Sequence, residues 1–145
     1  MEGDIVYLTP ETIPDSSIIR GHKNQSGFEN HPIVVLGKER RNGTMIVSFR
    51  LLTTFNGHTV EEKRQGGREH QRKFFMMVEN HQDMANSTIN PVAKMAPGFD
   101  ALKRRSYVNL SSNSRFEVEY EYLEAFGKDP LRRLDAGSVS YIKSA

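Results

Sequence analysis

Short apolar runs separated by polar turns dominate the first half of the chain and predict β-strands. Residues 4–8 are β-branched and aromatic, and Pro10 ends that run. Residues 32–36 are apolar after an opening proline, which is typical of a strand buried on both faces. Residues 45–52 instead alternate between the two faces of a strand. The first half therefore predicts three strands.

Asn42-Gly43 lies between the second and third runs and predicts a two-residue hairpin turn. Both residues tolerate the positive φ that a type I′ turn requires. With this turn, Arg41 faces Thr44, and the pairing away from the turn sets Leu36 opposite Phe49. The face that carries Leu36 and Phe49 is apolar and is expected to point to the core.

The other face of this hairpin is expected to carry His31, Arg50 and Thr54, with His31 opposite Thr54. A single β-bulge would exchange Thr54 for Thr53. An imidazole serves as general acid or base, a guanidinium holds phosphate, and a hydroxyl donates to a phosphoryl oxygen. Together they would cleave RNA without a metal by activating its 2′-hydroxyl. Such a His–Thr pair is also common on inert surfaces, and the stem of Arg50 would equally cover apolar neighbours.

The second half predicts further strands and two short helices. Tyr120, Leu123 and Phe126 have the spacing of a short helix that ends near Gly127, and Asp135 is a good N-cap for a final helix. The strands are expected at residues 74–78, 106–110 and 115–118, and the polar inserts at about 9–30, 59–73 and 79–100. The fold class predicted is mainly β, an antiparallel β-barrel or half-barrel with short C-terminal helices, in a single domain over residues 1–145.

Composition narrows the possible chemistry. The chain has 145 residues and no cysteine, which excludes a disulfide scaffold, a zinc–cysteine site and a cysteine nucleophile. No run approaches the ~18 apolar residues of a membrane span, and the start resembles no signal peptide, so we expect an intracellular protein. No metal is expected, because the remaining histidines lack ligand spacing: His22, His58, His70 and His81. No cofactor is expected either, and the glycines form neither a P-loop nor a G-x-G-x-x-G fingerprint. A net charge of +2 permits a polyanionic partner without demanding one.

The order of elements resembles the PemK/MazF-like family, toxin endoribonucleases built on an SH3-like barrel. The resemblance covers most of the chain apart from the inserts around Gly66 and Asn86. It rests on short motifs: Gly3-Asp4-Ile5-Val6, His31-Pro32-Ile33-Val34-Val35-Leu36, Met45-Ile46-Val47 running to Leu52-Thr53-Thr54, and the Ser106-Tyr107-Val108-Asn109-Leu110 strand.

The resemblance implies a metal-independent ribonuclease. The family's catalytic arginine precedes the proline that opens the second strand, and His31 holds that position here. The family's catalytic threonine or serine corresponds to Thr53 or Thr54. The loop over residues 9–30 corresponds to the one that gates RNA. Substrate contacts are expected from Arg20, His22, Lys23 and Arg50.

The partners implied are single-stranded RNA, an antitoxin-like protein and a second copy of the chain, in a cytoplasmic homodimer. The change from arginine to His31 leaves two functions open. One is RNA binding with RNA cleavage, in which one acid/base group replaces another. The other is a non-catalytic interaction module that binds protein or nucleic acid.

Overall fold

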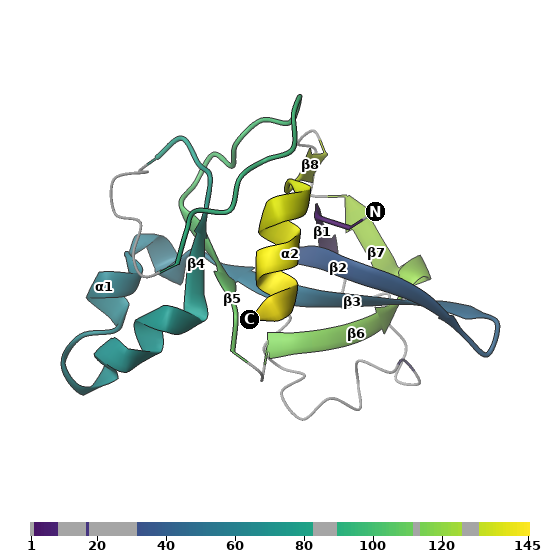
Figure 1. The fold of residues 1–145 in the computed structure, drawn as a ribbon, viewed down its shortest axis with the longest axis horizontal. Helices are drawn as coiled ribbons and strands as arrows, with labels where there is room; N and C mark the ends of the chain where they lie inside the picture. Colours follow the sequence, from purple (N-terminus) through teal and green to yellow (C-terminus); the bar gives the residue numbers. More distant parts are fainter. Residues whose placement is uncertain (1, 9–16, 18–31, 83–89, 112–113, 126–130) are drawn as a thin grey trace.

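A computed structural model of the chain describes residues 2–8, 17, 32–82, 90–111, 114–125 and 131–145 (Figure 1). These residues form a mainly β fold, as the sequence predicts, in which a curled antiparallel sheet makes a half-barrel. The strands are β1 (Asp4–Leu8), β2 (Pro32–Arg41), β3 (Thr44–Thr53), β4 (Phe75–Val78), β5 (Ser106–Asn109), β6 (Arg115–Glu119), β7 (Leu123–Ala125) and β8 (Arg132–Arg133). The helical elements are η4 (Phe55–Gly57), α1 (Val60–Lys63), η5 (Gly66–Phe74), η7 (Tyr120–Tyr122) and α2 (Ala136–Ser144).

Strand β3 is the centre of this sheet. The strand order is β4-β5-β3-β2-β1-β7, with β6 also paired to β3 and β8 to β1. One edge of β3 pairs with β2. The other edge pairs first with β6, over residues 46–50, and then with β5, over residues 52–53. The two edge partners of β3 therefore change over at Arg50 and Leu51.

The hairpin predicted from Asn42-Gly43 is confirmed. Both residues have positive φ, 52° and 82°, and Arg41 pairs with Thr44. The pairing follows the predicted register from there to Gly37–Ser48.

The predicted register is wrong beyond that pair. A β-bulge between Val35 and Gly37 shifts the pairing by one residue, so that Phe49 lies opposite Val35 instead of Leu36. Arg50 therefore lies opposite Val34 and shares its face. The bulge coincides with a close approach of the two strands, because a Cβ at Gly37 would lie 3.2 Å from the Ser48 Oγ.

Residues 33–36 of β2 and 49–52 of β3 are buried on both faces, which explains the uninterrupted apolar run of β2, whereas the hairpin is exposed near its turn. Helix α2 lies across one face (Figure 1), and its Val139 and Ile142 join a cluster with Val34 and Leu36. On the opposite face, Phe49 stacks on Phe116 of β6, with ring centroids 5.6 Å apart. A third cluster joins α1 to β4 and β5: Val60, Phe75, Met77 and Tyr107.

The C-terminal elements differ in part from the prediction. The final helix is confirmed, since the Asp135 carboxylate accepts the Ser138 N–H at 2.7 Å. The helix predicted from Tyr120, Leu123 and Phe126 is wrong. Tyr120 begins a single 3-10 turn, and Leu123 begins β7, which pairs with β1. Pairing along a strand edge outweighs the weak helical spacing.

The three predicted inserts differ in what the structure shows for them. Residues 59–73 form α1 and most of η5. The described part of 79–100 makes isolated bridges to β4 and to Leu134. Residues 9–30 lie outside the described residues, apart from Ser17, whose hydroxyl donates to Glu119. Within the described part of the chain, every helix is too short or too polar to cross a lipid bilayer.

Arg50 lies where β3 changes its pairing partner from β6 to β5. Its side chain is 2% exposed. Its Nη1 donates to the carbonyls of Asn109 (3.3 Å) and Ser111 (2.7 Å), and its Nη2 donates to the carbonyl of Ala145 (3.3 Å). Burial, and then the charge of Arg115, lower the pKa of Arg50, but a guanidinium stays charged. Arg50 thus ties β3 to the end of β5 and to α2.

We predict that Arg50→Ala lowers the free energy of unfolding by about 3 kcal/mol, because it removes charged hydrogen bonds and leaves three carbonyls inside the protein. Urea unfolding measures the change. The control is Arg40→Ala on the exposed hairpin, which should stay within about 0.5 kcal/mol of wild type. Equal stability of the two variants would contradict the structural role of Arg50.

Candidate functional site at the end of strand β3

The two threonines predicted to be catalytic lie where β3 ends. Thr53 pairs with Tyr107 of β5, and its Oγ1 accepts the Phe55 N–H at 3.2 Å. The carbonyl of Thr54 accepts the Gly57 N–H at 2.9 Å, which closes a tight turn. Both threonines are half-buried. They therefore begin the segment that leaves the sheet.

Of the other predicted site residues, Arg50 is the one that the structure describes, and it does not reach this place. Arg50 is buried and directed at backbone carbonyls. His31 lies outside the described residues, as do the other predicted contacts, Arg20, His22 and Lys23. The bulge in β2 shifts the register by one residue. If this register continued to position 31, the residue expected opposite it would be Thr53 instead of Thr54. The meeting of His31 with a threonine stays a prediction.

The turn after Thr54 has an unusual backbone. Three consecutive residues, Phe55, Asn56 and Gly57, have positive φ (50°, 54° and 88°). Two of them are not glycine, and each such residue costs on the order of 1–3 kcal/mol. The Phe55 ring offsets this cost by packing on Phe75 and Tyr107, at 4.9 and 5.4 Å between centroids. The turn then reverses the chain, and His58 follows it with its side chain about half exposed.

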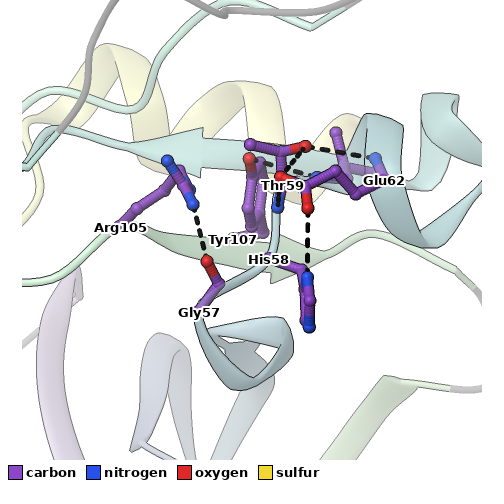
Figure 2. Close-up of polar contacts among 7 residues, drawn as sticks. Gly57, His58, Thr59, Glu62, Arg105 and Tyr107 are labelled. Atoms are coloured by element: carbon purple, nitrogen blue, oxygen red, sulfur yellow. Dashed lines mark hydrogen bonds and ion pairs between the residues drawn. The ribbon is translucent and has the colours of Figure 1, made fainter.

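A carboxylate holds the His58 imidazole. The Glu62 Oε2 lies 3.0 Å from the His58 Nδ1 (Figure 2). The other oxygen, Oε1, accepts both the N–H (3.2 Å) and the hydroxyl (3.1 Å) of Thr59. The Glu62 N–H in turn donates to the Thr59 Oγ1 at 3.1 Å, which completes a capping box at the start of α1. Both oxygens of Glu62 are therefore engaged.

These contacts determine the charge of Glu62. The hydrogen bond from His58, followed by those from the Thr59 backbone and hydroxyl, lowers the pKa of Glu62 from its ordinary value of 4.5. Glu62 is thus ionised at neutral pH and can only accept a hydrogen bond. In the neutral imidazole, the hydrogen then sits on Nδ1, and Nε2 keeps its lone pair.

Two residues near the start of β5 support the turn. The Arg105 Nη2 donates to the carbonyl of Gly57 at 2.8 Å, and the Arg105 N–H donates to the Gln82 side chain at 3.0 Å. The Val60 N–H donates to the Tyr107 hydroxyl at 3.3 Å. Figure 2 shows the Arg105–Gly57 contact beside the His58–Glu62 pair. The position of His58 therefore depends on the sheet.

His58 is not among the site residues that the sequence predicts. The spacing of the histidines argues against a metal at His58, and the segment after it is predicted to be a polar insert. The sequence signal that could have indicated this site is the Thr59-x-x-Glu62 spacing. This spacing predicts a capping box and hence a short helix directly after His58. Among the described residues, no three His, Asp or Glu side chains come together to hold a metal ion.

A second exposed histidine also has a carboxylate partner. The His81 Nε2 lies 2.9 Å from the Asp100 Oδ1, and this contact lowers the pKa of Asp100. The Asp100 Oδ1 also accepts the Ala101 N–H at 2.9 Å. Neither threonine at the end of β3 makes a described contact with this second pair.

Basic residues are in excess at the end of the molecule formed by α1, η5, β4 and β5 (Figure 1). Residues 53–82 and 100–107 carry eight Lys and Arg against five Asp and Glu, whereas the rest of the chain carries twelve against thirteen. The guanidinium of Arg64 lies over the rings of Phe55 and Phe75, 5.3 and 5.1 Å from their centroids. This end of the molecule therefore carries a small excess of basic side chains.

Comparisons with known proteins give no match for this chain, whether with family models, with curated proteins or with solved structures. The resemblance to the PemK/MazF-like family therefore stays a prediction from the short motifs.

We predict that Glu62→Gln destabilises the protein at pH 7 and that this effect fades in acid. A carboxyl with a lowered pKa stabilises the fold fully above its ordinary pKa of 4.5, and this contribution is lost as pH falls through the lower folded pKa. Thermal unfolding of wild type and variant between pH 7 and pH 3 measures the difference. The control is Glu69→Gln, whose carboxylate lies 4.0 Å from Arg72 on exposed η5. A constant difference for Glu62→Gln would contradict the ionised contact.

Proposed function

We propose that this protein binds single-stranded RNA at the end of β3 and cleaves it without a metal. The observation that supports this function best is the exposed His58 imidazole, held by Glu62 on the turn that follows Thr53 and Thr54. An imidazole titrates near neutral pH, so it can accept and return a proton under physiological conditions. The surrounding excess of basic side chains suits a phosphate backbone.

RNA is the substrate class that matches these groups. Its 2′-hydroxyl is an internal nucleophile, so cleavage requires a base to take the proton and cations to offset the charge that develops on phosphate. The Arg64 guanidinium over Phe55 adds a flat, cationic surface on which an unpaired base can stack. A single strand fits better than a duplex, because its bases and sugar are free to reach the turn.

This function agrees with the resemblance to the PemK/MazF-like family. That resemblance adds His31 as an acid/base group, Arg20, His22 and Lys23 as substrate contacts, a homodimeric assembly and an antitoxin-like protein partner. These additions are separate proposals, and each can fail while RNA cleavage at the end of β3 holds.

A groove on another face favours the second candidate, a non-catalytic interaction module. The groove measures about 880 Å³ and runs over β2, β3 and β6 beside α2. Leu36 and Ile46 contribute apolar surface, while Glu2 and Lys143, paired at 2.6 Å, lie at its side. Such a mixed surface suits a peptide more than RNA.

We predict that purified protein cleaves labelled single-stranded RNA in excess EDTA and leaves products ending in 2′,3′-cyclic phosphate. DNA of the same sequence should remain intact, because it lacks the 2′-hydroxyl. Thr53→Val and His31→Ala should each lower the cleavage rate on the order of tenfold or more. Intact RNA across varied sequences would remove the enzyme claim.

RNA affinity is a separate prediction. Gel-shift titrations at several salt concentrations should show affinity that falls steeply with salt, with a slope of about −0.7 per phosphate contact in a log–log plot. Replacing Lys103 and Arg104 by glutamine together should weaken binding and reduce this slope, since both side chains are exposed beside the basic end of the molecule. Absence of RNA binding at low salt would favour the interaction module.

A further inference from the structure

We infer that His58 is the general base of the RNA cleavage proposed above and that Glu62 is the residue that positions it. This inference rests on the proposed function and adds the atom that takes the proton. It follows from the tautomer that the carboxylate imposes, the anchoring of that carboxylate, and the location of the pair.

The contact with the Glu62 carboxylate leaves Nε2 as the ring nitrogen of His58 that can accept a proton. Because the ionised Glu62 accepts the hydrogen on Nδ1, the neutral His58 ring keeps a lone pair on Nε2. Figure 2 shows the contact at the edge of the ring nearest to Glu62, with the opposite edge directed away from it. The His58 side chain is 51% exposed, so part of the ring faces solvent. An accessible lone pair on a fixed ring is the property required of a general base.

The anchoring of Glu62 makes this orientation stable. Two contacts from Thr59 hold Oε1, at 3.2 and 3.1 Å, and leave Oε2 for the imidazole. The Glu62 backbone is fixed by the capping box, and α1 is itself attached to Tyr107 through the Val60 N–H. The Glu62 carboxylate therefore loses little further conformational entropy when it accepts the hydrogen bond from the His58 ring. The same carboxylate stabilises the imidazolium that forms when Nε2 takes a proton.

The location of the pair selects His58 over His81. The turn that carries His58 begins at Thr54, and the Thr54 carbonyl accepts the Gly57 N–H. A turn closed in this way keeps its first and fourth Cα atoms, those of Thr54 and Gly57, within about 7 Å. Of the two carboxylate-paired histidines, His58 is therefore the one that a tight turn joins to the threonines predicted to be catalytic.

The step balances with water as its one co-reactant. Nε2 of His58 takes the proton of the ribose 2′-hydroxyl while the 2′-oxygen forms a bond to phosphorus. The bond from phosphorus to the 5′-oxygen breaks, and the electron pair remains on that oxygen, which takes a proton from water. The products are a 2′,3′-cyclic phosphate and a 5′-hydroxyl end. The imidazolium then returns its proton to the hydroxide left by that water.

Steady-state cleavage of RNA in EDTA tests the assignment with four proteins: wild type, His58→Ala, Glu62→Gln and His81→Ala. We expect His58→Ala to lower kcat at least 100-fold with little change in KM, since a general base contributes 10²–10⁴-fold. Glu62→Gln should lower kcat about tenfold, because the ring loses its preferred tautomer. His81→Ala should keep the wild-type rate, as it removes a similarly exposed, carboxylate-paired imidazole that no tight turn joins to the threonines of β3.

Nitrogen NMR of the histidine rings gives a readout that does not depend on activity. Wild-type His58 should show the tautomer with the hydrogen on Nδ1, and Glu62→Gln should shift it toward the tautomer with the hydrogen on Nε2. Circular dichroism verifies that each variant is folded, and His58→Gln replaces His58→Ala if the latter unfolds.

The outcomes separate the two proposals. If wild type leaves RNA intact, the proposed function fails and this inference fails with it. If wild type cleaves RNA and His58→Ala or His58→Gln cleaves as fast, His58 is not the base, and RNA cleavage stands without it. An unchanged tautomer in Glu62→Gln would overturn the positioning role of Glu62 alone.

Discussion

The fold depends on how β3 divides its outer edge between two strands. A strand has two edges, and one edge of β3 is taken by β2, so β6 and β5 must share the other. Where one partner replaces the other, backbone carbonyls are left without a ladder partner inside the protein, and an unpaired buried carbonyl is costly. Arg50 supplies donors to the carbonyls of Asn109 and Ser111 at this point. A buried cation therefore allows one long strand to serve two parts of the sheet.

This division places the candidate site. Because β3 continues past β6 and pairs with β5, its last residue, Thr53, lies beside Tyr107 at the end where α1 packs. In the strained turn that follows, the Phe55 ring packs on Tyr107, and the Gly57 carbonyl accepts a hydrogen bond from Arg105. The contacts that build α1 also engage both oxygens of Glu62 and so orient His58. Stability and the proposed chemistry thus use the same side chains.

Local patterns were enough to predict several elements. Asn42-Gly43 indicated the hairpin because few residues accept positive φ at both turn positions, and Asp135 indicated the last helix because its carboxylate can accept a free N–H. The apolar run of β2 indicated a strand buried on both faces. The helix expected at Tyr120 was wrong, because the choice between a helix and an edge strand depended on the free edge of β1.

The sequence by itself determined the mainly β class, the hairpin with its turn, the final helix, and the two threonines at the end of a strand, since each follows from residues close together in the chain. Only the tertiary structure decided the bulge that moves Arg50 to the face of Val34, the burial of that arginine, and the support of the His58 turn by Arg105 and Tyr107. The side-chain hydrogen bonds of Arg50, Arg105 and Tyr107 join residues 47 to 95 positions apart. No local pattern encodes them, because they depend on which strand edges meet once the sheet has curled.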